Sequence, residues 1–216
     1  DDDLSHTEHS IGFMTAVDVA TEALDRLQPT AASHDRVMIL EVMGRDAGHI
    51  ALVSGIAGGA DIILIPEIPY QMKNIADKIQ SLREAGRNFA LMVVSEAVGT
   101  ETGEKAKIMD LEGRSRYGGI SHHIANRITE LTGAETRFTV LGHVQRGGQP
   151  SAQDRVLASV FGTHAVDLIA QGKFDRMVAW QNRHVVDVSI QQAIAGYQAV
   201  DIHGSLVKTA RGLGIC

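Results

Sequence analysis

The stretch 39–52, ILEVMGRDAGHIAL, joins an apolar run to a helical pattern of small residues through Met43-Gly44-Arg45. The apolar run predicts a buried strand, and ligands of open α/β sheets collect at the carboxyl ends of strands. A glycine at such a turn lets the backbone approach a ligand closely, and arginine forks well onto a phosphate or carboxylate. A tight turn with a solvated arginine explains the same residues, so this stretch alone leaves both interpretations open.

Apolar runs alternate with helical patterns through the first 150 residues. We expect strands at 36–43, 61–67, 88–97 and 135–141, and helices at 11–27, 49–56, 73–84 and 120–131. Strands that are apolar almost throughout suit a sheet covered on both faces, and the alternation requires strand–helix–strand crossovers. The predicted fold is therefore α/β, with a doubly wound, mostly parallel sheet and helices on both faces.

Two segments depart from this alternation. Residues 99–119 are polar and glycine-rich, and they are long for a connection inside a compact unit, so we expect a surface excursion. After Pro150, a helical pattern covers 151–169 behind a serine cap, and a β-like run follows at 177–188.

Composition limits the kinds of partner. The 216 residues carry a formal net charge of −6, which argues against nucleic acid or an anionic membrane surface as the main partner. No apolar stretch approaches the roughly 20 residues of a membrane span. The one cysteine, Cys216, cannot form a disulfide within the chain, which fits a reducing, cytoplasmic location.

A second glycine turn carries basic side chains. The stretch 139–155, TVLGHVQRGGQPSAQDR, delivers Gly142, His143 and Arg146 from the end of a predicted strand into a turn before a capped helix. Phosphate sites combine such backbone amides with imidazole and guanidinium groups. A glycine turn with exposed histidine and arginine remains the alternative, although it is the second strand end of this kind.

Charged residues at other strand and helix ends have alternatives too. Glu96 ends a strand and could accept hydrogen bonds from sugar hydroxyls, or it could be a simple strand-edge charge. Asp1–Asp3 precede a helix, where they either mark a solvated helix start or bind Mg²⁺ and accept a proton. Arg36 and Arg137 lie at the amino ends of their strands, so they are structural or they serve a site on another subunit.

Taken together, these stretches resemble the 6-phosphofructokinases, both ATP-dependent and diphosphate-dependent. The blocks that carry the resemblance are, in chain order, DDDLSHTEHSIGF, SHDRVMILEVMGRDAGHIAL, GGADIILIPE, VVSE and ETRFTVLGHVQRGGQPSAQDRVLA. The resemblance covers the later part of such an enzyme. The chain starts inside a motif similar to TIDND, so we expect the N-terminal lobe, with its donor-phosphate loops, to be missing.

The resemblance implies a role for each matching residue. Asp1 matches the aspartate that takes the proton from the sugar 1-hydroxyl, and Asp3 matches an aspartate near magnesium, so Asp3 is the candidate metal ligand. Asp2 stands where the family usually has asparagine, with an effect that the sequence does not reveal. Catalytic roles are implied for Asp1, Asp3 and Arg45, and substrate-binding roles for Arg36, Met43, Gly44, Arg45, Glu96, Arg137, His143 and Arg146.

The implied activity is phosphoryl transfer from ATP or diphosphate to fructose 6-phosphate, with Mg²⁺ as cofactor, in glycolysis. Residues 1–150 would form the sugar-phosphate-binding lobe, and 151–216 would return to the absent donor-binding lobe. Arg36 and Arg137 would reach across a subunit interface, which implies a homo-oligomer, either a dimer or a tetramer. The sequence does not decide the donor, and this fragment alone is expected to be inactive. A non-catalytic sugar-phosphate-binding or regulatory subunit is the rival interpretation.

Overall fold

The structure is a computed structural model that describes residues 1–109 and 115–215. Its helices are α1 (Phe13–Ser33), α2 (His49–Ala57), α3 (Met72–Glu84), α4 (Ile120–Thr132), α5 (Ala152–Ala170), α6 (Ile190–Ile194), α7 (Ser205–Gly212) and the short 3₁₀ helix η1 (Gly142–Arg146). Its strands are β1 (Val37–Val42), β2 (Ile62–Leu64), β3 (Ala90–Ser95), β4 (Lys107–Met109), β5 (Ser115–Tyr117), β6 (Thr136–Val140), β7 (Arg176–Gln181) and β8 (His184–Ser189).

Four of these strands form a parallel sheet in the order β2-β3-β1-β6. The central strand β1 is buried along its whole length, with Val37 paired to Ala90 of β3 and to Thr136 of β6. Because every strand of the sheet runs the same way, all four carboxyl ends meet at one edge. The parallel α/β fold expected from the sequence is confirmed.

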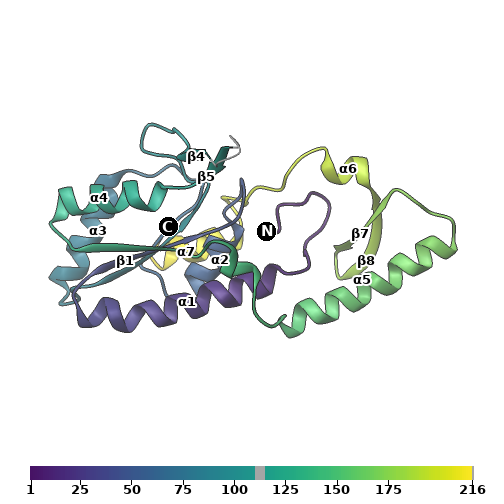
Figure 1. Cartoon of the computed structure of the whole chain (residues 1–216), viewed down its shortest axis with the longest axis horizontal. Coiled ribbons are helices and arrows are strands. Elements are labelled where there is room, and N and C mark those ends of the chain that lie inside the picture. The colour runs from purple at the N-terminus through teal and green to yellow at the C-terminus, as the bar shows by residue number, and fades with distance from the viewer. Residues whose placement is uncertain (110–114, 216) are drawn as a thin grey trace.

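Helices cover both faces of the sheet (Figure 1). On one face, Leu40 and Val42 of β1 share an apolar core with residues of α1, α2 and α7. On the other face, Val37 and Ile39 pack with residues of α3 and α4. This alternation along β1 is the two-residue period of a strand, and it confirms the doubly wound arrangement.

A second part of the chain lies beside the sheet lobe and consists of α5, the antiparallel β7–β8 pair and α6 (Figure 1). The side chain of Ser151 accepts a hydrogen bond of 3.1 Å from the amide of Asp154, as the expected serine cap requires. The chain then returns: Val207 and Ala210 of α7 lie in the core shared with α1 and α2. By its packing α7 belongs to the sheet lobe, although the sequence grouped it with the rest of 151–216 outside that lobe.

Local boundaries differ from the expectations in three places. The run 177–188 is two strands, because Asn182 and Arg183 both adopt positive φ and make a tight turn without glycine. Helix α1 continues past Leu27 through Pro29, since Ala31 is buried against Met38 and Leu91. The excursion 99–119 contains the β4–β5 pair, and its residues 110–114 lie outside the described part.

Among the helices of the described residues, none combines the length and the apolar character that a membrane span needs.

Candidate active site

The turn after β1 requires glycine at position 44. A Cβ on Gly44 would lie 2.7 Å from the carbonyl oxygen of Ala47, a contact that no larger residue could make. The amide of Ala47 closes the turn by donating to the Gly44 carbonyl at 3.2 Å. Arg45 follows with a φ of 51°, a conformation that costs a non-glycine residue about 1–3 kcal/mol. Its surroundings must therefore hold this arginine in place.

Glu96, directly after β3, holds the turn from one side. Its Oε1 accepts hydrogen bonds from the amides of Gly44 at 3.1 Å and Arg45 at 3.0 Å. Both bonds use the same oxygen, so Oε2 remains able to accept from a ligand. The structure thus gives Glu96 a role in shaping the turn, and its expected contact with sugar hydroxyls stays a prediction.

Gln145 holds the turn from the other side, and the sequence analysis missed it. Its side chain is 1% exposed, its Oε1 accepts from the Met43 amide at 3.0 Å, and its Nε2 donates to the Met43 carbonyl at 3.3 Å. These paired bonds join η1 to the end of β1. A signal existed in the sequence, since Gln145 lies between His143 and Arg146, but an uncharged side chain suggested no chemistry.

The turn and η1 together line a cavity of about 750 Å³ at the carboxyl edge of the sheet. Its lining includes Met43, Arg45, Asp46, Glu96, Tyr117, His143 and Arg146. The structure therefore brings together the residues that the two glycine turns contributed to the predicted substrate site. The backbone of Gly44 belongs to the same unit through its bond to Glu96.

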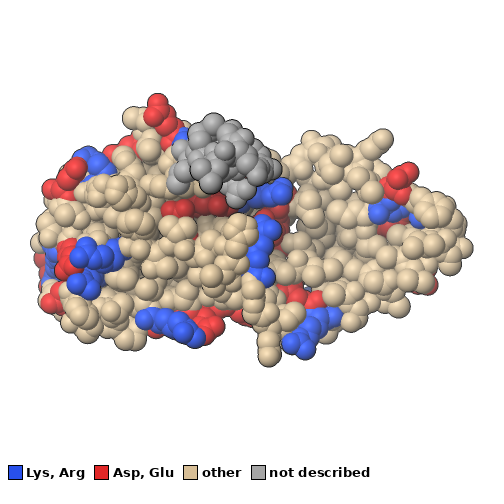
Figure 2. All heavy atoms as spheres, in the orientation of Figure 1, with Lys and Arg blue, Asp and Glu red and all other residues tan. Residues whose placement is uncertain are grey.

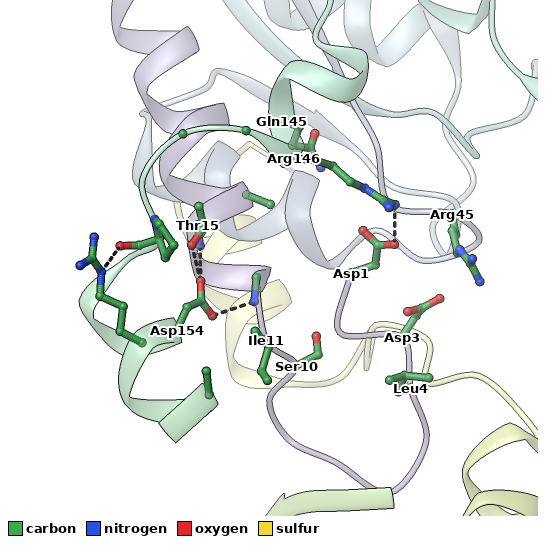
Figure 3. Close-up of a pocket in the computed structure, with 17 residues that line it drawn as sticks. Asp1, Asp3, Leu4, Ser10, Ile11, Thr15, Arg45, Gln145, Arg146 and Asp154 are labelled. Carbon is green, nitrogen blue, oxygen red and sulfur yellow. Dashed lines mark hydrogen bonds and ion pairs between the residues drawn. The ribbon is translucent and has the colours of Figure 1, made fainter. Parts of the chain in front are cut away.

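A neighbouring cavity of about 650 Å³ contains the predicted acidic residues. Asp1 and Asp3 line it together with Arg45, Gln145 and Arg146. The Arg146 Nη2 lies 3.5 Å from the Asp1 Oδ2, and Figure 3 shows Asp1, Asp3, Arg45 and Arg146 gathered on one side of this cavity. Arg45 and Arg146 line both cavities. Their guanidinium groups are therefore shared between the cavity of the acidic residues and the cavity beside the first glycine turn.

Asp2, which stands where the family usually has asparagine, makes its side-chain hydrogen bonds with Ser10. Its Oδ1 accepts hydrogen bonds from the Ser10 amide at 2.7 Å and from the Ser10 hydroxyl at 2.5 Å. Its φ is 57°, a region in which asparagine and aspartate are both enriched. An asparagine could accept the same bonds through its own Oδ1, so the departure has a structural explanation that leaves Asp1 and Asp3 unaffected.

The opposite wall of this cavity is fixed by Asp154, a second residue that the sequence analysis missed. Its carboxylate accepts from the amides of Gly12 at 2.9 Å and Thr15 at 2.8 Å, from the Ser151 hydroxyl at 3.1 Å and from the Thr15 hydroxyl (Figure 3). Burial alone would raise the pKa of Asp154, but these hydrogen bonds outweigh it and lower that pKa. The carboxylate ties the start of α1 to the start of α5.

Arg36 and Arg137 are not brought to these cavities. They lie at the amino ends of β1 and β6, while the site lies beyond the carboxyl end of β1, which is six residues or roughly 20 Å long. Glu135 joins them, because its Oε1 lies 2.8 Å from Arg36 Nη2 and 2.6 Å from Arg137 Nη2. Within one chain they cannot reach these cavities, which leaves the two interpretations made from the sequence.

The donor set for Mg²⁺ is sparse. Within residues 1–109 and 115–215, no three His, Cys, Asp or Glu side chains gather closely enough to hold a metal ion. Asp1 and Asp3 share a cavity wall, however, and Mg²⁺ is often bound by one or two carboxylates plus waters and substrate phosphates. The oxygen ligands present therefore fit a Mg²⁺ ion that is held jointly with a phosphorylated ligand.

Charged side chains of both signs border the hollow between the sheet lobe and the α5–β8 part (Figure 2). A doubly wound sheet with arginines on two glycine turns at its carboxyl edge defines an α/β protein with groups suited to a phosphorylated ligand at that edge. The chain belongs to the phosphofructokinase family, whose model matches residues 1–169.

Known proteins similar to the chain agree with this assignment. The ATP-dependent 6-phosphofructokinase 1 of Synechocystis sp. is 63% identical over the whole chain, and that of Nostoc sp. is 61% identical. The chain spans about 60% of the length of each of these two relatives.

Two solved structures superpose with a TM-score of 0.75 each. Phosphofructokinase from Saccharomyces cerevisiae is 28% identical, and the match covers 99% of this chain and 26% of that one. A pyrophosphate-dependent phosphofructokinase from Marinobacter aquaeolei is 26% identical, with 94% of this chain and 52% of that one covered.

Proposed function

We propose that the longer polypeptide to which this chain corresponds transfers a phosphoryl group from ATP to the 1-hydroxyl of fructose 6-phosphate. The observation that carries the proposal is the shared border of the two cavities. Arg45 and Arg146 lie between a cavity that suits the sugar phosphate and a cavity lined by Asp1 and Asp3. A substrate with a phosphate at one end and a reacting hydroxyl at the other fits this arrangement.

Each group then has a task that its chemistry supports. His143 and Arg146 would bind the 6-phosphate in the larger cavity, beside the first glycine turn. Asp1 would accept the proton of the 1-hydroxyl, and a positioned base of this kind contributes typically 10²–10⁴-fold. Arg45 would stabilise the negative charge that builds on the transferring group, since phosphoryl transfer depends mainly on positioning and charge. In this proposal the arginine of the first turn serves the chemistry directly.

A bound Mg²⁺ would be held by Asp3, with Asp1 close by, and would offset the negative charge of the donor phosphates. His143, Arg146 and Arg45 would orient the sugar phosphate without help from that ion. Because the donor would supply the remaining oxygen ligands, we expect metal binding to depend on the donor.

ATP is the donor that two relatives support, because those 63% and 61% identical are named ATP-dependent. Diphosphate has weaker support from a pyrophosphate-dependent structural relative at 26% identity. We further propose a cytoplasmic homo-oligomer, a dimer or a tetramer, in which Arg36 and Arg137 of one subunit complete the site of another. The position of both arginines far from their own cavity supports this arrangement.

A kinase assay of the complete protein tests the proposal. With fructose 6-phosphate and Mg²⁺, we expect turnover with ATP and at most slow turnover with diphosphate. Efficient turnover with diphosphate alone would reverse the donor assignment. Binding of fructose 6-phosphate without turnover from either donor would favour the rival, a regulatory or non-catalytic subunit.

A further inference from the structure

Three side chains form a cluster at the edge of the proposed phosphate cavity. The Asp46 Oδ1 accepts a hydrogen bond from Lys105 Nζ at 3.0 Å and another from the hydroxyl of Tyr117. Lys105 Nζ also donates to the Tyr117 hydroxyl at 3.0 Å and lies 5.0 Å from the centre of the tyrosine ring. Each polar group of this cluster, which we call the Asp46 cluster, is thus bonded to both of the others.

The position of the cluster gives it a consequence for the site. Asp46 follows Arg45 in the chain, and Asp46, Tyr117 and Arg45 line the same cavity as His143 and Arg146. An unpaired carboxylate at this place would repel a bound phosphate, and it could also pair with the guanidinium of Arg45. The hydrogen bond from Tyr117 and then that from Lys105 lower the pKa of Asp46, and Arg45 has a smaller effect in the same direction. Asp46 is therefore a charged group with three neighbours that compete for it.

The stability of the fold does not explain the cluster. The side chains of Lys105 and Asp46 are 42% and 51% exposed, and exposed pairs of this kind are worth about 0–1 kcal/mol. Lys105 and Tyr117 come from the excursion 99–119, which lies outside the parallel sheet. A contact that adds little stability, but touches the residue next to a proposed catalytic arginine, points to a role in the site.

We infer that Tyr117 is a positioning residue which, with Lys105, holds the carboxylate of Asp46 away from Arg45 and offsets its charge, so that Arg45 stays available to the substrate. This inference rests on the proposed function, because it takes the sugar phosphate as the ligand of the cavity. It assigns a role at the substrate site to two residues of an excursion that lies outside the parallel sheet. The same two residues would set how much negative charge the bound phosphate meets.

The test uses the complete protein and measures binding of fructose 6-phosphate by calorimetry. Tyr117→Phe keeps the ring but removes the hydroxyl, and we expect the dissociation constant to rise about three- to tenfold, as for other coupled neighbours. Tyr70→Phe is the matched control. The Tyr70 hydroxyl is buried without a hydrogen-bond partner among the described residues, so this change should leave binding within about twofold.

The decisive comparison adds Asp46→Ala to Tyr117→Phe. If Tyr117 acts by restraining Asp46, removing the carboxylate restores binding to at least the level of the wild type. If Tyr117 only shapes the wall of the cavity, the double variant stays as weak as Tyr117→Phe, and the inference is overturned. Lys105→Met gives a second route to the same test, with weakened binding that Asp46→Ala should also restore.

The outcomes separate this inference from the proposed function. Wild-type protein that binds fructose 6-phosphate, with Tyr117→Phe unchanged, overturns the inference alone. Wild-type protein that neither binds the sugar phosphate nor turns it over removes the proposed function, and the inference with it.

Discussion

Replacing Gln145 with alanine tests whether the two glycine turns form one unit. In the structure Gln145 makes two hydrogen bonds, at 3.0 and 3.3 Å, to the backbone of Met43, and its side chain is buried. Alanine would leave the half-buried amide and carbonyl of Met43 without these partners. Each lost hydrogen bond contributes about 0.5–1.5 kcal/mol, so we expect Gln145→Ala to lower the free energy of unfolding by about 1–3 kcal/mol.

The assay is urea denaturation of the complete protein, with Gln153→Ala as the matched control. Gln153 is exposed on α5, where the change to alanine should alter stability by no more than about 0.5 kcal/mol. Gln145→Ala should also weaken binding of fructose 6-phosphate, because Met43 and Arg45 belong to one turn. A loss of stability no larger than that of Gln153→Ala would refute the reasoning that Gln145 holds this turn.

Three further predictions concern charged residues. Arg146→Ala should raise the KM for fructose 6-phosphate about ten- to a hundredfold, since a charge-assisted contact worth roughly 1.5–3 kcal/mol is lost, and an unchanged KM would remove Arg146 from the site. Hydrogen bonds lower the pKa of Asp154 in the folded state, so its stabilising effect is present above the ordinary value of 3.8 and is lost as pH falls through the lowered value. The difference in unfolding free energy between wild type and Asp154→Asn should therefore shrink in acid titrations below about pH 4, and a difference independent of pH would contradict this. Hybrids of Arg137→Ala and Asp1→Asn subunits should regain activity that neither variant has, whereas freely exchanging subunits without complementation would argue against shared sites.

Much of the sheet lobe could be predicted from the sequence because its physical signals are local. The strands around Ile39, Ile63 and Val93 are apolar almost throughout, as strands covered on both faces must be. Gly44 and Gly142 mark the turns at the carboxyl edge, and each turn carries an arginine. Such patterns need only a few neighbouring residues to be recognised.

The features that the sequence did not predict depend on distant contacts. Gln145 binds a backbone 102 residues earlier, and Asp154 binds the start of α1 across about 140 residues, so the sequence around each residue does not reveal its partner. Asn182 and Arg183 make a tight turn without the glycine that usually marks one, which is why one β-like run was expected where two strands occur. The expected helix 11–27 ended too early, because the burial of Ala31 against distant strands favours continuation.

The Asp46 cluster shows the same limit within the site itself. Asp46 lies inside the stretch 39–52, yet its partners are 59 and 71 residues away in a polar excursion. Nothing in the local pattern around Lys105 or Tyr117 indicates that either residue reaches the edge of the sheet. Only the folded chain brings them beside Arg45.

A substitution at Asp1 separates binding of fructose 6-phosphate from the transfer of the phosphoryl group. In the complete protein, Asp1→Asn keeps the shape of the side chain but removes a base, so fructose 6-phosphate should bind within about threefold of wild type while kcat falls by about 10²–10⁴-fold. Binding is measured by calorimetry without ATP, so that no turnover occurs, and kcat is measured by a coupled assay of product formation at saturating ATP and Mg²⁺. A near-normal kcat would contradict the account, because it would show that the carboxylate beside Arg146 takes no part in the transfer.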